Sequence, residues 1–254
     1  MENKINPEVK ELLDKLTDAM KECGQLILNA DRSEAMVDEK AGHANFVTTY
    51  DKMVQVKLQE KFAEILPEAV FVGEEEDIHA SIEKGLAFIV DPIDGTTNFI
   101  KDYHTGAISV GLLKDGEQYL GAVYNPYLDE LFTAVKGCGA YLNGKPIHVS
   151  KQPLSNGIVL FGTAPYYEEL NKASFDMAYD YFKKALDIRR SGSAALDLCS
   201  VAAGRAELFF ELRLSPWDYA AGSLIITEAG GIVTTVEGGA ITFDKPCSVL
   251  ARNM

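Results

Sequence analysis

The sequence lacks the long apolar runs, paired cysteines and surplus of basic residues that mark membrane-spanning, zinc-binding and nucleic-acid-binding proteins. No apolar stretch approaches the roughly 18 residues that cross a bilayer, and residues 1–8 carry no apolar core of a signal peptide. The four cysteines lie far apart without a Cys-x-x-Cys motif, which fits thiols in a reducing cytoplasm. Acidic residues outnumber basic ones by 38 to 24, and the net charge of −14 disfavours nucleic acid or an anionic membrane as the main partner. We therefore expect a cytoplasmic protein that binds neither.

Linkers, repeats and low-complexity segments are also missing, so the sequence offers no point at which to divide the chain. With 47% hydrophobic residues, 254 residues are enough to bury a sizeable core. We expect one domain over residues 1–254, in which residues 1–150 and 151–254 form two intimate halves.

Two short apolar runs each end in carboxylates. Residues 86–90 lead into Asp-Pro-Ile-Asp-Gly-Thr-Thr at 91–97, and residues 69–72 lead into Gly73 and the acids 74–76. Ligands of α/β proteins bind at the carboxyl ends of strands, where both acid clusters are expected. Carboxylate oxygens at such an edge suit Mg²⁺. The glycine and the amides that follow it suit a phosphate. The same Asp-Pro-x-Asp-Gly string is typical of a plain turn after a strand, and this alternative stays open.

Further downstream, Ser215 and Pro216 open a helical pattern in which Asp218 follows. With Ser215 as N-cap, Asp218 falls at position N3, where an acid closes a capping box and favours the helix dipole. Asp51 likewise precedes an amphipathic pattern and by itself reads as a helix cap. Each acid therefore has both a structural and a functional interpretation.

Three blocks, in order and spacing, resemble those of the inositol monophosphatases: residues 73–75, 91–99 and 217–222. The similarity extends over about residues 40–252 and includes 46–51 and 190–195. It implies a Mg²⁺-dependent, lithium-sensitive phosphomonoesterase that acts as a homodimer. Members of the family hydrolyse inositol phosphates, fructose 1,6-bisphosphate, histidinol phosphate or adenosine 3′,5′-bisphosphate.

The resemblance also implies ligands for two to three Mg²⁺ ions. The first ion is assigned Glu74, Asp91 and the backbone carbonyl of Ile93, and the second is assigned Asp91, Asp94 and Asp218, so that Asp91 bridges the two. A third, weaker ion would lean on Glu74 and water, near Glu75. Like charges at close range raise one another's pKa, and divalent cations relieve that repulsion.

By the same resemblance, water attacks the phosphate in line, activated by the metals, by Glu74 and by a Thr96 hydroxyl paired with Asp51. The backbone amides of Gly95 and Thr96 would hold the phosphate. No Cys-x5-Arg loop is present to suggest a phosphoenzyme.

The substrate side is assigned Glu211, the loop formed by Gly192, Ser193 and Ala194, and Asp218, which is also a metal ligand. A carboxylate at Glu211 would accept polyol hydroxyls and favours myo-inositol 1-phosphate. The residue is also explained as the edge of an apolar strand.

Other functions stay open. Arg213 could pair with Glu211, lie on the surface or meet a second phosphate, so fructose 1,6-bisphosphate remains an alternative. Adenosine 3′,5′-bisphosphate is another, and a protein that keeps the fold but only binds a phosphorylated ligand or a protein is the non-enzymatic one. The complete acid set argues against the last, because clustered acids destabilise a fold unless metal is used.

Apolar periodicity and turn residues predict most of the secondary structure. The predicted helices cover residues 7–30, 51–65, 168–187, 194–203 and the segment that begins at Ser215. The predicted strands lie near 70 and 86, at 158–160, 207–211 and 248–251, and as a pair around Val233 and Ile241. Residues 106–149 read as an antiparallel meander. This α/β (α+β) pattern predicts the layered α-β-α-β-α sandwich that the resemblance also implies.

Overall fold

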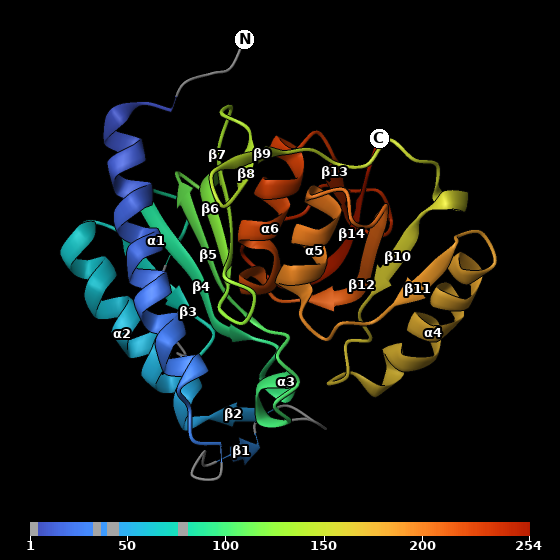
Figure 1. The fold of residues 1–254 in the computed structure, drawn as a ribbon, viewed down its shortest axis with the longest axis horizontal. Coiled ribbons are helices and arrows are strands. Elements are labelled where there is room, and N and C mark those ends of the chain that lie inside the picture. Colours follow the sequence, from blue (N-terminus) through green and yellow to red (C-terminus); the bar gives the residue numbers. More distant parts are fainter. Residues whose placement is uncertain (1–4, 33–36, 40–45, 76–80) are drawn as a thin grey trace.

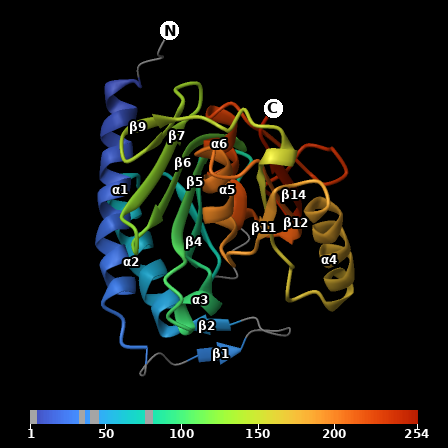
Figure 2. The same cartoon turned by 45° about the vertical axis from the view of Figure 1, so that its right-hand side comes forward.

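The computed structural model describes residues 5–32, 37–39, 46–75 and 81–254, which form alternating layers of helices and sheets. Figures 1 and 2 show helices outside a large sheet, further helices between that sheet and a smaller one, and helical structure outside the smaller sheet. The predicted α-β-α-β-α sandwich is therefore confirmed. Among the described residues, no helix is long and apolar enough to span a membrane.

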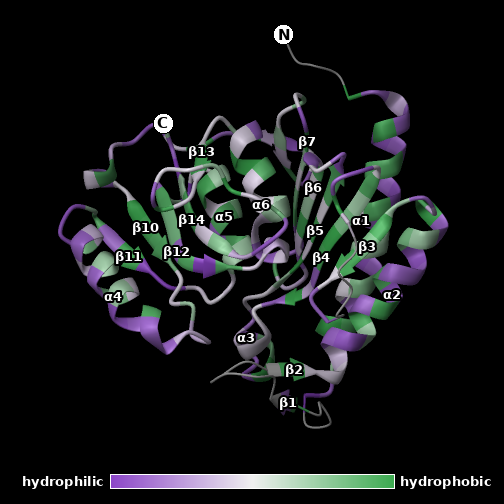
Figure 3. Cartoon of the chain, turned by 180° about the vertical axis from the view of Figure 1, so that it is seen from behind, coloured by the Kyte–Doolittle hydropathy of each residue, from purple (hydrophilic) through white to green (hydrophobic). Residues whose placement is uncertain are grey.

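The first outer layer contains α1 (Pro7–Leu28) and α2 (Thr49–Ile65). Asn6 caps α1 by accepting the Glu8 N–H at 2.9 Å, and Pro7 occupies the first turn, where a missing N–H is tolerated. Both helices bury their apolar faces on the large sheet, and Figure 3 shows polar residues on the opposite faces. A separate small hairpin of β1 (Val37–Glu39) and β2 (Phe46–Thr48) was not predicted.

Among the described residues, the large sheet has seven strands in chain order. They are β3 (Val70–Gly73), β4 (Leu86–Asp94), β5 (Ala107–Lys114), β6 (Glu117–Asn125), β7 (Glu130–Val135), β8 (Ala140–Leu142) and β9 (Lys145–Ile147). Only β3 and β4 pair in parallel, and the remainder is the predicted antiparallel meander. The short helix α3 (Thr96–Ile100) follows β4.

The middle layer contains α5 (Ala194–Ala202) and α6 (Pro216–Glu228), which are almost wholly buried. Helix α6 approaches β5 and β6 so closely that only glycine fits beneath it. A Cβ at Gly111 would lie 2.9 Å from the Ala220 Cβ, and one at Gly121 would lie 2.8 Å from the Ala221 carbonyl oxygen. This close contact fixes the start of α6, and with it Asp218, relative to the large sheet.

The smaller sheet has the strand order β11-β10-β12-β14-β13. Its strands are β10 (Ile158–Phe161), β11 (Asp187–Arg189), β12 (Leu208–Leu214), β13 (Ile232–Thr234) and β14 (Cys247–Arg252), and α4 (Glu168–Phe182) covers its outer face.

One boundary and one predicted strand are wrong in this half. The helix predicted to reach residue 187 ends at Phe182, because Asp187–Arg189 pair in parallel with β10 and Ile188 packs against the core there. The strand predicted around Ile241 does not form. Ile241 packs into the core from an irregular segment, the Thr242 carbonyl accepts the Tyr219 hydroxyl, and β14 takes the place beside β13.

Candidate active site

Asp91 and Asp94 lie at the end of β4 and are 2% and 7% exposed. Residues three apart in a regular strand point to opposite faces, but the pairing of β4 with β5 is irregular between these two. Both carboxylates therefore reach one pocket, where they meet Asp218. One ligand atom from each of the three acids lies within 4.8 Å of the others.

Glu74 reaches the pocket from the neighbouring strand. Gly73 pairs with Val90 in parallel, and the Glu74 N–H donates to the Val90 carbonyl at 3.1 Å, so both strands end at the same edge. Glu74 lines the pocket beside Asp91. The two predicted acid clusters thus meet through Glu74, while Glu76 lies outside the described residues.

Asp218 stands at the third position of α6. Its carboxylate accepts the backbone N–H of Ser215 at 2.7 Å, as the capping interpretation predicts. The same carboxylate also belongs to the acid cluster. One side chain serves both purposes, because the first turn of α6 is anchored against the edge where β4 ends.

The electrostatics of this cluster fit a metal site. Burial, and then the charges of Glu74 and Asp94, raise the pKa of Asp91 well above its ordinary value. Burial, with Asp94 and Glu74 nearby, does the same for Asp218. Burial raises the pKa of Asp94 to about 6, although hydrogen bonds from Ser193 and the following amides lower it. Buried, mutually repelling carboxylates without nitrogen or sulfur ligands are a donor set suited to Mg²⁺.

Asp94 is held by a segment nearly a hundred positions away. Ser193 is the N-cap of α5, and its hydroxyl donates to the Asp94 carboxylate. The N–H groups of Ala195 and Ala194 donate to the same carboxylate at 2.9 and 3.3 Å. The loop predicted for substrate binding (Gly192, Ser193 and Ala194) lines the pocket, and two of its members also hold a metal-ligand candidate. A serine N-cap followed by good helix formers was the sequence signal that could have revealed these donors.

Asp51 and Thr96 lie together as predicted. Asp51 is 1% exposed, and one of its oxygens accepts both the backbone N–H of Thr48 at 2.7 Å and the Thr48 hydroxyl. The other oxygen faces the Thr96 hydroxyl at 3.2 Å, and the Ile93 carbonyl is an alternative acceptor for that hydroxyl at 3.3 Å. Burial raises the pKa of Asp51 to about 6, while its hydrogen bonds with Thr48 lower it. The N-cap of α2 is thus Thr48, three residues before the predicted cap, and Asp51 closes the capping box as its N3 residue. Asp51 also supports the pocket wall through Thr96.

The turn between β4 and α3 requires glycine. Gly95 adopts φ = 100°, in the left-handed region, and a Cβ there would lie 3.0 Å from the Thr105 carbonyl oxygen and 3.3 Å from that of Gly192. Gly95, Thr96 and Ile93 all line the pocket beside the acids. The predicted phosphate side and the predicted metal side therefore belong to one cavity.

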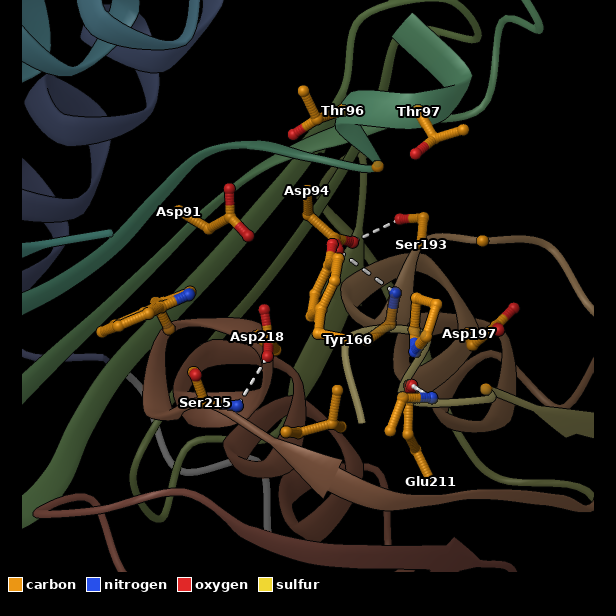
Figure 4. Close-up of a pocket in the computed structure, with 18 of the residues that line it drawn as sticks. Asp91, Asp94, Thr96, Thr97, Tyr166, Ser193, Asp197, Glu211, Ser215 and Asp218 are labelled. Carbon is orange, nitrogen blue, oxygen red and sulfur yellow. Dashed lines mark hydrogen bonds between the residues drawn. The ribbon is translucent and has the colours of Figure 1, made fainter. Parts of the chain in front are cut away.

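Glu211 is buried at the other end of the pocket (Figure 4). Its Oε1 accepts the Ala164 N–H at 2.8 Å, and burial raises its pKa to about 7. Arg213 does not pair with it; the guanidinium lies 4.5 Å from the centre of the Tyr167 ring. Glu211 is thus a partner of the loop after β10 as well as a wall of the pocket.

The pocket encloses about 450 Å³ and draws on both halves of the chain. Sequence reasoning missed several of its side chains as parts of the lining, among them Tyr166, Asp197 and Trp217. Tyr166 carries no motif, because its place follows from how the loop after β10 folds. Asp197 is buried on α5, and burial raises its pKa well above the ordinary value.

Comparisons with known proteins agree with this geometry. The Inositol monophosphatase family matches residues 8–253. The Nus factor SuhB of Salmonella typhimurium is 36% identical over 87% of this chain and 84% of its own length, and the Inositol-1-monophosphatase of Bacillus subtilis is 35% identical over 92% and 89%. The crystal structure of the extragenic suppressor protein suhB from Bartonella henselae superposes with a TM-score of 0.89 at 33% identity and covers 96% of this chain and 94% of that one.

Proposed function

Because the chain belongs to the inositol monophosphatase family, we propose that it is a Mg²⁺-dependent phosphatase that hydrolyses a phosphorylated cyclitol or sugar, with myo-inositol 1-phosphate as the preferred substrate. The observation that carries the proposal is the cluster of the buried Asp91 and Asp94 with the partly buried Asp218, whose ligand atoms lie within 4.8 Å of one another. Clustered buried acids destabilise the fold by themselves, and their retention is explained by a cation.

The metal ligands in this proposal are Glu74, Asp91, Asp94, Asp218 and the backbone carbonyl of Ile93. Two to three bound Mg²⁺ would supply positive charge that stabilises the phosphate oxygens and eases the deprotonation of water. The first turn of α5 keeps the Asp94 carboxylate oriented through the donors Ser193 and Ala195, so it is ready for a cation.

The chain's other residues position water and phosphate. Thr48 occupies one Asp51 oxygen, so the other oxygen accepts the Thr96 hydroxyl. The oxygen of that hydroxyl can then accept a hydrogen bond from water. Glu74 would take the proton from water as the water oxygen attacks phosphorus, and the leaving ester oxygen would take up a proton from solvent to give the alcohol. The amides of Gly95 and Thr96, at the turn into α3, hold the phosphate.

Glu211 is the residue proposed to select the substrate. A buried carboxylate that faces the pocket leaves an acceptor unpaired unless the substrate brings a hydroxyl, which favours a polyol over an apolar ester. The substrate loop (Gly192, Ser193 and Ala194) and Asp218 form the adjoining walls. The name of the Bacillus subtilis relative supports inositol 1-phosphate in particular.

We also infer the domain organisation, the oligomeric state and the cellular compartment of the enzyme. The proposal treats the chain as one domain, because the pocket draws side chains from residues 1–150 and from 151–254. It includes a cytoplasmic, lithium-sensitive homodimer. Free thiols at all four cysteines support a reducing compartment.

The test is phosphate release, with and without Mg²⁺, from myo-inositol 1-phosphate, fructose 1,6-bisphosphate, glycerol 2-phosphate, histidinol phosphate and adenosine 3′,5′-bisphosphate. We expect Mg²⁺-dependent turnover with the inositol phosphate ranked first. A higher rate with either bisphosphate would replace the substrate assignment but keep the reaction. No turnover with any of them would favour the second candidate, a protein that binds a phosphorylated ligand or a protein, which the relatives named Nus factor SuhB support.

A further inference from the structure

The loop between β10 and α4 is folded around Glu211. Gly162 leaves no room for a side chain, since a Cβ there would overlap the Glu211 carboxylate. Ala164 adopts the left-handed conformation with φ = 44° and donates its N–H to Glu211 at 2.8 Å. The Tyr167 N–H then donates to the Ala164 carbonyl at 2.9 Å and closes a turn. A left-handed alanine persists only where its surroundings impose it, so the orientation of this turn is fixed by buried contacts.

The turn places the Tyr166 side chain in the pocket. Tyr166 lines the same cavity as Glu74 and Asp218, and in Figure 4 its hydroxyl end points toward Asp94. Partial burial, and then the charge of Glu74, raise the pKa of the Tyr166 phenol above its ordinary value. A phenol with its ordinary pKa of about 10 is already protonated at neutral pH, so the hydroxyl is available as a donor.

No hydrogen-bond partner of this hydroxyl is found among the residues that the structure describes. The carboxylates around it are the metal ligands of the proposed function, and their oxygens would be engaged by the bound cations. The acceptor that would remain near them is the phosphate of the substrate, which in the proposed function is held by the amides of Gly95 and Thr96 at the start of α3.

We propose that the Tyr166 hydroxyl donates a hydrogen bond to a non-bridging oxygen of the substrate phosphate, which makes Tyr166 a substrate-binding residue of this site. The proposal rests on the proposed function for the position of the phosphate. It assigns the loop after β10 two tasks, because the contacts that bury Glu211 also present Tyr166.

The experiment compares Tyr166→Phe with the wild type and uses inorganic phosphate as the probe. Phosphate affinity is measured by calorimetry in saturating Mg²⁺, and kcat and KM are measured with the best substrate of the panel. Mg²⁺ affinity is measured through the fluorescence of Trp217, which is the single tryptophan and lines the pocket. Tyr179→Phe is the matched control, because Tyr179 is 62% exposed on α4 and is not part of the pocket lining.

Loss of one hydrogen bond to a charged group should weaken phosphate binding by about 10- to 100-fold and lower kcat/KM to a similar extent. Mg²⁺ affinity and the melting temperature should not change, and Tyr179→Phe should match the wild type. Unchanged phosphate affinity in Tyr166→Phe would overturn the proposal, because the Tyr166 hydroxyl would then contribute nothing to phosphate binding. A loss of Mg²⁺ affinity would also overturn it.

The two proposals fail separately in this design. If the wild type hydrolyses nothing but Tyr166→Phe still loses phosphate affinity, the proposed reaction is wrong and the phosphate contact stands. If the wild type is active and Tyr166→Phe equals it in every measurement, only the phosphate contact is wrong.

Discussion

Asp94→Asn separates the contribution of Asp94 to metal binding from its contribution to the fold. Burial raises the Asp94 pKa to about 6. The unfolded chain has a value of about 3.9, so keeping this carboxylate ionised at pH 7.5 without metal costs about 3 kcal/mol. The asparagine removes that cost. Its amide oxygen keeps the bonds from Ser193 and Ala195, but its NH₂ group then faces the Ala194 N–H, and the unpaired donors cost about 1–3 kcal/mol. The two terms nearly cancel.

We therefore expect the metal-free variant to unfold within about 2 kcal/mol of the wild type. The response to Mg²⁺ should differ. At 100 times its dissociation constant, Mg²⁺ stabilises the wild type by about 2.7 kcal/mol, or about 5–10 °C in melting temperature for a chain of this size. The variant should lose most of this shift, and its phosphate release should fall by more than about 100-fold.

The assays are thermal unfolding in EDTA and in Mg²⁺, and phosphate release from the best substrate. Asp176→Asn is the control, since Asp176 lies on the surface of α4 in an ion pair with Lys172. An Asp94→Asn enzyme with wild-type activity, or one that keeps the full Mg²⁺ shift, would refute the assignment of Asp94 as a metal ligand.

Three further predictions concern neighbouring groups. Gln55→Leu should raise the Mg²⁺ concentration for half-maximal activity by about 10-fold or more. The reason is that the buried Gln55 accepts the Glu75 N–H at 2.9 Å and fixes the backbone beside Glu74. An unchanged Mg²⁺ titration would contradict this. In the metal-free protein, the raised pKa of Asp94, about 6, contributes stability that is complete below about pH 3.9 and is lost as the pH rises through 6. The Mg²⁺-induced rise in melting temperature should therefore be larger at pH 7.5 than at pH 5, and equal shifts would speak against a carboxylate site. Glu211→Gln should lower kcat/KM for myo-inositol 1-phosphate by about 10-fold or more and spare p-nitrophenyl phosphate, which has no hydroxyls; equal losses on both would argue against selection of hydroxyls.

The sequence predicted those parts of the fold whose local signals agree with the tertiary structure. The cap at Ser215, the acids at the ends of β3 and β4, and the meander from β5 to β9 follow from patterns that the packing reinforces. The predictions failed where tertiary contacts override the local pattern. Helix α4 ends before Asp187 because Asp187–Arg189 pair with β10. The segment around Ile241 forms no strand because the Thr242 carbonyl accepts the Tyr219 hydroxyl.

The candidate site divides in the same way. The acids that follow apolar runs could be found from the sequence, because a strand that ends in carboxylates is a local signal. Tyr166 could not be found so, because it depends on a left-handed Ala164 imposed by Glu211, which lies 47 positions further along the chain. Residues that act through the fold of a loop carry no pattern of their own.

The pocket depends on contacts between the two halves. Asp94 comes from the large sheet, and the donors that orient it come from the first turn of α5, 99 to 101 positions later in the chain. The first N–H groups of a helix have no partner inside the helix, so Asp94 satisfies them while the helix dipole favours its charge. The same carboxylate is therefore needed by α5 for its cap and by the cluster as a ligand. This shared use explains why an acid whose burial disfavours its charge is compatible with a well-packed middle layer even before any cation binds.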